Sequence, residues 1–270
     1  MALVPKHQDA YGAEILAYYH DTSVGSGGAG GAGGRPATQP GRNGPGAAPF
    51  EIVERDDGYI GFSRGPERYF SPYDQWPQYE RDALSFARGR VVDVGCGAGR
   101  HSIHLKSQGH AVVPLDNSPG AVEVSRLRGL DEARLAGIQD ITAEIGSIDT
   151  MLFMGNNFGL FQDRETCREL LGRFHGLTGA AGRIIAESMD PYATKDPDHL
   201  QYHRRNRAAG RMGGQLRIRI RFRRIIGPWF DYLLVSRDEM RDLLAGTGWH
   251  LERVIEGPGG AFVAIIGKAG

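Results

Sequence analysis

The stretch VVDVGCGAGRHSIHL, residues 91–105, carries the pattern that decides the fold. An apolar strand runs into three glycines at alternate positions, Gly95, Gly97 and Gly99, and a helix follows them. Glycines at this spacing let the backbone approach a ligand closely and adopt positive φ angles at which other side chains would clash. The start of the helix presents free N–H groups beside the loop. We therefore expect a ligand to bind where this strand ends.

Short apolar strands and helices alternate along the chain from residue 89 onward. The helix starts carry clear signals, with Ser118 before Pro119, Asp163 as an N-cap, and a capping box at residues 236–239. Strands that alternate with helices predict an α/β fold with a doubly wound, mostly parallel sheet. The expected strands cover residues 91–94, 111–115, 151–154, 183–187, 250–255 and 261–266.

Composition narrows the class of protein. The 270 residues include 32 basic and 32 acidic side chains, which argues against binding of nucleic acid through bulk positive charge. The two cysteines exclude a disulfide scaffold and a four-thiolate zinc site. No signal-peptide pattern opens the sequence, and no apolar run reaches the ~20 residues of a membrane span. We expect a cytoplasmic protein with no membrane partner.

The 40 glycines are unevenly distributed. Residues 25–46 read GSGGAGGAGGRPATQPGRNGPG and offer no large apolar side chain, which predicts a flexible linker. The amphipathic helix before it is expected either to act as a lid or to dock on the core. The expected divisions are an N-terminal helix at 1–24, the linker at 25–49, a cap segment at 50–88, a core at 89–190, a cap insertion at 191–235 and the end of the core at 236–270.

The glycine loop departs from the dinucleotide-binding fingerprint. Counting from Gly95, Arg100 stands where G-x-G-x-x-G/A wants glycine or alanine. Asp116 ends the second strand about 20 residues after Gly95, where an acid can accept hydrogen bonds from ribose hydroxyls. The fourth strand leads into a polar loop, residues 155–158, at the same edge of the sheet. A nicotinamide-dependent enzyme is thus the less favoured alternative.

This combination resembles the class I S-adenosylmethionine (SAM)-dependent methyltransferases, whose first motif is an apolar-Asp-apolar-Gly-x-Gly-x-Gly stretch, matched here by Val92 to Gly99. The likeness covers about residues 89–190, and 236–270 by order of elements. It implies a seven-stranded sheet whose last two strands form a hairpin, with an antiparallel cap inserted after strand five, and SAM as cofactor. The cofactor-binding residues that it implies are Asp93, Gly95, Cys96, Gly97, Asp116, Asn117, Ile138, Gln139, Met154 and Asn156.

The resemblance also implies roles for these positions. Asp93 would approach the methionine amino group, Gly95 and Gly97 would pack against the amino acid and the ribose, and Asp116 would bind both ribose hydroxyls. Asn156 would lie near the methionine end.

The adenine-binding loop of the family corresponds to residues 136–140. Many members have an acid where Gly137 falls, so that Gln139, Asp140 or the backbone of Ile138 would take its place. Cys96 is expected to be a small apolar filler rather than a nucleophile, because methyl transfer from a sulfonium needs none.

The loop Gly155-Asn156-Asn157-Phe158 resembles the Gly-Asn-Ser-Phe loop of glycine and sarcosine N-methyltransferases. That likeness spans a few residues and does not carry their substrate over. Variable elements at the sheet edge select the acceptor in such folds. Asn157, together with Tyr18 or Tyr19 of the N-terminal helix, is therefore predicted to bind substrate.

A second group of candidates lies in the cap insertion. His199, Tyr202 and His203 lie close together on one expected helix, and the two histidines share a face. They are our candidate catalytic residues, which would act as a general base or bind the methyl acceptor. The alternatives are that they lie on a solvated surface or bind a metal. We predict no metal, because no third ligand is identifiable.

Arginines alternate with apolar residues in LRIRIRFRR, residues 216–224, which predicts a strand with one basic face. Arg217 and Arg219 either lie on a solvated face or meet an anionic partner, which would be a carboxylate or phosphate substrate, a second subunit, or RNA. Asp231, on the expected partner strand, would form an ion pair with one of these arginines.

Taken together, these patterns predict a SAM-dependent methyltransferase that transfers a methyl group to a small molecule, with an anionic substrate as one alternative. An RNA or protein methyltransferase would keep the site and use the arginine strand to bind its partner. Nucleic acid is the less favoured partner, because one stripe alone is basic.

Overall fold

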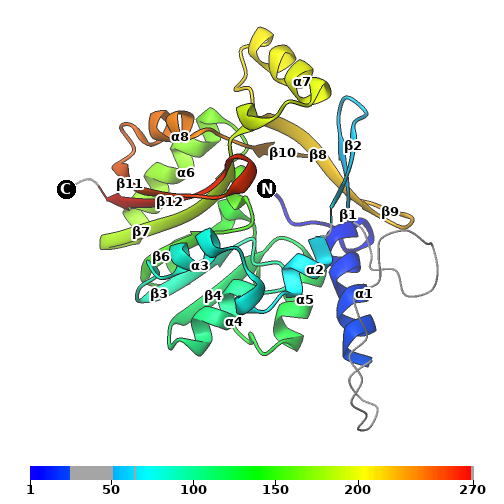
Figure 1. The fold of residues 1–270 in the computed structure, drawn as a ribbon. Helices are drawn as coiled ribbons and strands as arrows, with labels where there is room; N and C mark the ends of the chain where they lie inside the picture. The colour runs from blue at the N-terminus through cyan, green and yellow to red at the C-terminus, as the bar shows by residue number, and fades with distance from the viewer. Residues whose placement is uncertain (25–50, 64, 269–270) are drawn as a thin grey trace.

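The computed structural model describes residues 1–24, 51–63 and 65–268, so the predicted linker at 25–49 lies outside the described residues. The described residues form a large sheet covered by helices, and a smaller sheet beside it that carries helix α7 at its far end (Figure 1). In the described part of the chain, no helix combines the length and the apolar character needed to span a bilayer.

The large sheet has seven strands and confirms the predicted fold class. In spatial order the strands are β11 (Trp249–Glu256), β12 (Ala261–Lys268), β7 (Thr178–Met189), β6 (Ile148–Phe153), β3 (Arg90–Val94), β4 (Ala111–Asp116) and β5 (Arg134–Leu135). The last five strands of this order pair in parallel, whereas β12 runs antiparallel to both of its neighbours and forms a hairpin with β11.

Helices cover both faces of this sheet because successive strand residues point to opposite sides. Val92 and Ile184 belong to the apolar cluster that includes α6 and α8, whereas their neighbours Val91 and Ile185 belong to the cluster that includes α3 and α4. Strands buried on both faces read as continuous apolar runs, which is why the sequence revealed them. These helices are α3 (Gln78–Leu84), α4 (Arg100–Ser107), α6 (Arg164–Leu177) and α8 (Arg237–Leu244).

The predicted helix starts are confirmed. The side chains of Ser118, Asp163 and Ser236 each accept a backbone N–H at the start of a helix. Helix α6 ends at Leu177, and β7 begins at the next residue. The edge strand β5 was not predicted, because its two residues are too few to show the alternation by which a strand is recognised. Helix α3 begins after Pro77.

The smaller sheet is the predicted antiparallel cap, completed by strands from the N-terminal segment. Strand β8 lies between β10 and β1, and β1 pairs with β2. Strands that precede the first strand of the large sheet in the sequence therefore pair with strands that follow β7. The strands are β1 (Glu51–Arg55), β2 (Ile60–Ser63), β8 (Gln215–Phe222), β9 (Ile225–Ile226) and β10 (Phe230–Leu233), and α2 (Gly65–Phe70) and α7 (Pro197–Ala208) adjoin them.

The basic face of β8 is paired within this sheet. Arg219 donates two hydrogen bonds to Glu54 of β1, and Arg221 also reaches Glu54 at 3.2 Å. Arg217 lies 3.2 Å from Asp231 of β10, as the sequence indicated. Carboxylates on both neighbouring strands thus offset the repulsion between arginines on one face.

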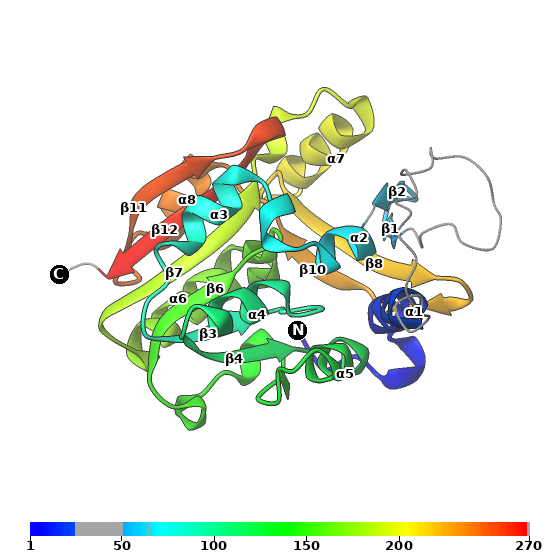
Figure 2. The same ribbon diagram turned by 60° about the horizontal axis from the view of Figure 1, so that its bottom comes forward.

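Helix α1 (Ala10–Val24) docks on α5 (Pro119–Leu127), and both figures of the fold show the two helices side by side (Figure 2). The carboxylate of Asp9 joins them, because it accepts the backbone N–H of Gly12 and of Gly120 and the hydroxyl of Ser118. A Cβ at Gly120 would lie 2.6 Å from the Cα of Gly12, so the contact requires a glycine there. The N-terminal helix is thus docked in the structure, and its expected role as a lid stays a prediction.

We predict that Asp9→Ala lowers the free energy of unfolding by about 3 kcal/mol, because a buried carboxylate then no longer satisfies N–H groups at two helix starts. Denaturation in urea would measure this loss, and faster amide exchange in α1 would locate it. Asp21→Ala, which removes an exposed acid of the same helix, should change stability by less than about 0.5 kcal/mol. Equal effects of the two substitutions would contradict the role of Asp9.

Candidate cofactor and acceptor site

The glycine loop follows β3 and lies at the carboxyl edge of the large sheet. Gly95, Gly97 and Gly99 have φ angles of 72°, 56° and 75°, a region that favours glycine. The N–H groups of Gly95 and Cys96 both donate to the carbonyl of Leu115 at the end of β4, at 2.8 and 2.9 Å. The loop is therefore anchored to the neighbouring strand by its backbone.

Asp116 organises the loop from the tip of β4. One carboxylate oxygen accepts the Gly97 N–H and the other accepts the Ser118 N–H, both at 2.9 Å. Burial raises the pKa of Asp116 to about 6 in spite of these hydrogen bonds. A carboxylate has about four acceptor positions, so these two contacts leave capacity for ribose hydroxyls.

Asp93, the last acid of β3, is also buried. Its carboxylate accepts the hydroxyl proton of Ser102 at 2.6 Å. Burial, with the neighbouring charge of Asp116 as a smaller contribution, raises the pKa of Asp93 to about 6. Two buried carboxylates thus stand beneath the glycine loop.

The polar loop after β6 joins the glycine loop at this edge. The side-chain amide of Asn157 donates to the carbonyls of Val94 and Gly95, so its described contacts brace the glycine loop. Asn156 adopts a left-handed conformation with φ 65°, and its backbone carbonyl accepts the hydroxyl of Tyr232 at 2.6 Å. The side-chain Oδ1 of Asn156 is buried and has no partner in the structure. A buried acceptor without a partner is a position that a ligand can satisfy.

The N-terminal segment lies over the adenine-loop side of this edge. The Val4 N–H donates to the carbonyl of Asn117, and the Asn117 amide donates to the carbonyl of Ala2. Gly137 lies against the carbonyl of Met1, and Asp140 accepts the Gly137 N–H. Ile138 is buried, whereas Gln139 is exposed. Residues of the N-terminal segment therefore cover the place where the family resemblance puts adenine.

Helix α1 brings a tyrosine onto the glycine loop. A Cβ at Gly97 would collide with the hydroxyl of Tyr11, so this hydroxyl lies directly over the loop. The Tyr11 ring meets that of Tyr69 edge to face, with centroids 5.5 Å apart. The described contacts of Tyr18 and Tyr19 are instead with Phe70 and, for Tyr19, with the carbonyl of Leu127. The predicted helix reaches the site through Tyr11, about two turns before the predicted Tyr18 and Tyr19.

Two carboxylates face this side of the loop, and the sequence analysis missed both. Glu51 of β1 accepts hydrogen bonds from Tyr69 at 3.0 Å and from Ser63 at 2.7 Å. Glu14 of α1 is fully buried, and neither of its carboxylate oxygens has a partner in the structure. Burial, followed by the charge of Glu51, raises the pKa of Glu14 to about 8. An acid on the otherwise apolar face of Tyr11 and Ile15 was the available signal.

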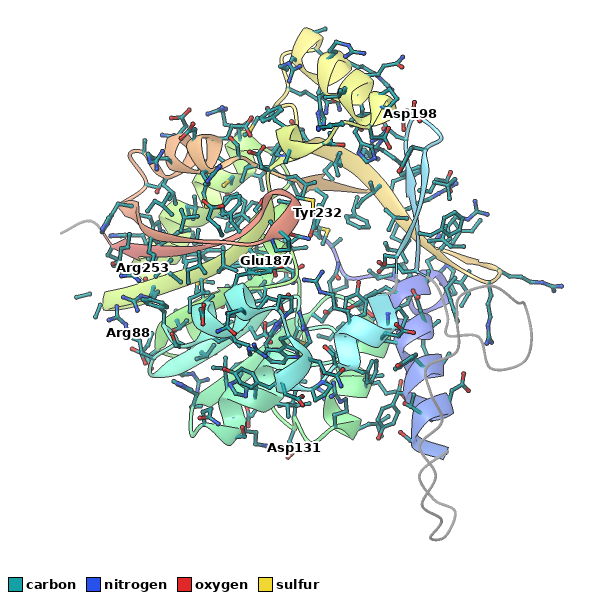
Figure 3. All side chains as sticks on the ribbon, in the orientation of Figure 1. Arg88, Asp131, Glu187, Asp198, Tyr232 and Arg253 are labelled. Atoms are coloured by element: carbon teal, nitrogen blue, oxygen red, sulfur yellow. The ribbon has the colours of Figure 1, made fainter. Side chains whose placement is uncertain are left out.

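A buried ion network holds the loops from the other side. Glu80 of α3 lies 2.6 Å from Arg68 and 2.6 Å from Arg100 at the start of α4. Glu187 of β7 accepts the Gly155 N–H at 2.6 Å and the Tyr79 hydroxyl at 3.0 Å. Arg100, which breaks the dinucleotide fingerprint, is thus occupied by an internal partner. Figure 3 shows Glu187 and Tyr232 on the strands that enclose the site.

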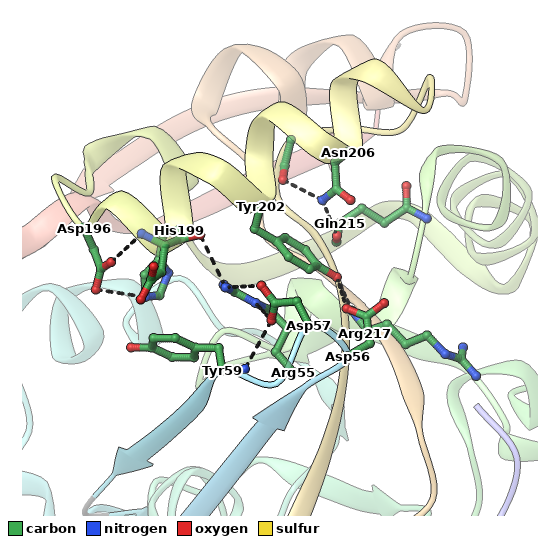
Figure 4. Close-up of polar contacts among 12 residues, drawn as sticks. Arg55, Asp56, Asp57, Tyr59, Asp196, His199, Tyr202, Asn206, Gln215 and Arg217 are labelled. Atoms are coloured by element: carbon green, nitrogen blue, oxygen red, sulfur yellow. Dashed lines mark hydrogen bonds and ion pairs between the residues drawn. The ribbon is translucent and has the colours of Figure 1, made fainter.

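The predicted catalytic residues of α7 contact the cap instead of the glycine loop (Figure 4). The Tyr202 hydroxyl donates to Asp56 at 2.7 Å, and its ring lies under the guanidinium of Arg55. His199 meets Asp196 and the ring of Tyr59, and His203 meets the ring of Tyr192. The contacts of Tyr202 and His199 attach α7 to the β1–β2 hairpin, and the Arg217 N–H of β8 also donates to the Tyr202 hydroxyl. The contact of His203 is with the turn that precedes α7. These contacts lend no support to the catalytic prediction.

A family model described as "Methyltransferase domain" matches residues 86–203, which include the glycine loop, Asp116 and the loop after β6. This stretch is therefore similar to methyltransferase domains. A SAM-dependent methyltransferase from Bacteroides fragilis, solved in complex with S-adenosyl-L-homocysteine, superposes with a TM-score of 0.76 at 25% identity, over 99% of this chain and 98% of that one. A methyltransferase from Clostridium acetobutylicum shares the fold, with a TM-score of 0.52 at 11% identity over 75% and 95% of the two chains.

Curated relatives match a shorter stretch of the chain. The ubiquinone biosynthesis O-methyltransferase of Xanthomonas oryzae is 37% identical over 82 residues, 28% of this chain and 34% of the relative. The protein of the same name from Xylella fastidiosa strain 9a5c is 42% identical over 71 residues, 24% and 29% of the two chains. The chain thus spans about a third of the length of the curated relatives it matches.

The buried acid of α1 predicts a pH dependence of stability. Glu14 has a pKa of about 8 in the folded protein, against an ordinary value of 4.5. Between these values the folded protein holds a proton that the unfolded chain has lost, so the free energy of unfolding falls as the pH rises from about 5 to 8. Glu14→Gln should flatten this fall, leaving the smaller contributions of Glu51, Asp93 and Asp116, whose pKa values are also raised.

Urea denaturation at pH 5, 6.5 and 8 would test this expectation. The matched control is Glu123→Gln, which alters an exposed acid of α5. If the free energy of unfolding of Glu14→Gln fell with pH as steeply as that of the control and of the original protein, Glu14 would not be the group that holds the proton in the folded state.

Proposed function

We propose that this protein is a SAM-dependent methyltransferase that transfers a methyl group to a small-molecule acceptor. The observation that carries the proposal is the glycine loop with the Asp116 carboxylate bonded to its centre, at the carboxyl edge of a class I sheet. The likeness over 99% of the chain to a methyltransferase solved with the demethylated cofactor supports it.

The residues of the loop fit a nucleoside with an amino-acid tail. At Gly95 and Gly97 a Cβ would collide with Asn157 and Tyr11, so both positions leave room for backbone alone. Asp116 would hold the ribose hydroxyls, and Asp93 would approach the methionine amino group. The unpartnered Oδ1 of Asn156 would accept a hydrogen bond at the methionine end. The N-terminal residues that contact Asn117 and Gly137 would cover the adenine side.

SAM supplies a methyl group on a positively charged sulfur, which is activated before it binds. The remaining task of the protein is to align the acceptor with the methyl carbon and to exclude water. Tyr11 of α1 and Tyr232 of β10 would close the site from opposite sides, because one lies on Gly97 and the other is bonded to the Asn156 carbonyl.

A macromolecular acceptor is less well supported. The arginines of β8 already face Glu54 and Asp231, which reduces the positive charge that an RNA phosphate would meet. A carboxylate or phosphate substrate held by Arg217 and Arg219 loses support for the same reason. The cytoplasmic location stays a prediction.

We predict that Asp116→Asn weakens binding of S-adenosyl-L-homocysteine by about tenfold or more, since a charged acceptor of ribose hydroxyls is worth about 1–3 kcal/mol. Isothermal titration calorimetry would measure the dissociation constant, and circular dichroism would verify that the variant folds.

Asp131→Asn is the matched control, because Asp131 is exposed on the outer surface (Figure 3). Absence of binding heat for the original protein at millimolar SAM and S-adenosyl-L-homocysteine would overturn the proposed function.

A further inference from the structure

The carboxylate of Glu14 is the least explained group in the described residues. It is fully buried, and both of its oxygens lack a hydrogen-bond partner. A buried carboxylate without a partner is costly, so native structures usually pair it. No basic side chain of the described residues forms an ion pair with Glu14. The arginines of β8 pair with Glu54 and Asp231, and Arg68 and Arg100 both pair with Glu80.

A second buried carboxylate, that of Glu51 in β1, acts electrostatically on Glu14 of α1. Glu51 is 7% exposed and binds Tyr69 and Ser63, and its charge contributes to the raised pKa of Glu14. Two acids on separate elements, α1 and β1, repel each other unless a proton or a cation lies between them. Below the raised pKa of Glu14 a proton on that carboxyl relieves the repulsion, and a cation bound between the two acids would displace this proton.

Aromatic rings surround the same place. Tyr11, Tyr69 and Tyr232 are partly buried. Burial raises the pKa of each hydroxyl, and the charge of Glu51 is among the further causes. Rings of this kind attract cations over their faces, and clusters of them recognise ammonium groups. Carboxylates and aromatic rings together are a common chemistry for binding a positively charged amine.

Two contacts fix this group at the methyl-transfer end of the site. The Tyr11 hydroxyl lies on Gly97, and the Tyr232 hydroxyl donates to the carbonyl of Asn156, which is the residue expected at the methionine end. Glu51 is joined to Tyr11 through the ring of Tyr69. The two acids thus stand on the side of the glycine loop from which an acceptor would approach.

We propose that the acceptor is an amine, cationic at neutral pH, whose ammonium group is bound by Glu14 and Glu51 among the rings of Tyr11, Tyr69 and Tyr232. This inference rests on the proposed function, and it replaces the anionic substrate that the arginine strand had suggested. Binding of the ammonium group displaces the proton of Glu14 to solvent, so that both carboxylates are charged around the cation. Glu14 then accepts one proton of the ammonium group.

The step balances with SAM as the methyl donor. Proton transfer to the Glu14 carboxylate leaves the amine neutral, with a lone pair on nitrogen. That lone pair forms the bond to the methyl carbon as the carbon–sulfur bond breaks, and the electrons of the broken bond stay on sulfur. The positive charge passes from sulfur to nitrogen, where the carboxylate of Glu51 would stabilise it.

Matched ligands that differ in charge test the proposal. The full chain is titrated with benzylamine, benzyl alcohol and benzoate, and with butylamine, 1-butanol and butyrate, with and without saturating S-adenosyl-L-homocysteine. We expect at least one amine to bind about tenfold more tightly than its alcohol, as charge-assisted contacts exceed neutral ones. Glu14→Gln and Glu51→Gln should each remove most of this preference, whereas Glu123→Gln should retain it.

The outcomes separate the inference from the proposed function. Amines that bind no more tightly than their alcohols, or a preference unchanged in Glu14→Gln and Glu51→Gln, would overturn the inference even if S-adenosyl-L-homocysteine binds. Selective amine binding without any binding of S-adenosyl-L-homocysteine would support the acidic amine site and reject the methyltransferase. Circular dichroism checks that both variants fold, and the neutral glutamine at position 14 is expected to be tolerated, since that acid favours its neutral form.

Discussion

The position of helix α1 depends on one carboxylate, and the acceptor side of the site depends on α1. Asp9 accepts N–H groups at the start of α1 and at the start of α5, so the positive ends of two helix dipoles converge on one negative charge. The resulting glycine-to-glycine contact brings the helices close together. Tyr11 then reaches Gly97 and Glu14 enters the interior. Without this carboxylate, neither side chain would have a fixed position relative to the loop.

Charge is distributed in opposite ways inside and outside the cap sheet. On the outer face of β8, arginines pair with Glu54 and Asp231, so the basic stripe of the sequence is neutralised locally. Toward the glycine loop, Glu14 and Glu51 are buried, and no basic side chain of the described residues pairs with them. The zero net charge of the chain averages over both faces. Two buried acids suit a reaction in which a positive charge enters the site and moves from one atom to another.

The sequence predicted the parts of the site that are local and missed those that are assembled. Three alternate glycines and an acid at the next strand end lie within one strand-helix-strand unit, so their neighbourhood follows from the parallel sheet. The helix that carries Tyr11 was predicted, but which of its tyrosines reaches the glycine loop depends on where α5 meets the helix. Glu51 is brought to Glu14 through pairing of β1 with β8, which no local pattern indicates. His199 and Tyr202 belong to one helix, as predicted, but their partners come from the β1–β2 hairpin.

The pairing of β1 with β8 has a consequence for how the molecule acquires its function. Glu54 and Arg219, partners across these strands, are 165 residues apart in the chain. Contacts between distant segments form slowly because closing a long loop costs entropy before the contact repays it. The strand-helix units that carry the glycine loop need no such closure. A chain emerging during synthesis would thus complete its nucleoside-binding half first, and would gain discrimination between acceptors only when the last third of the sequence is available.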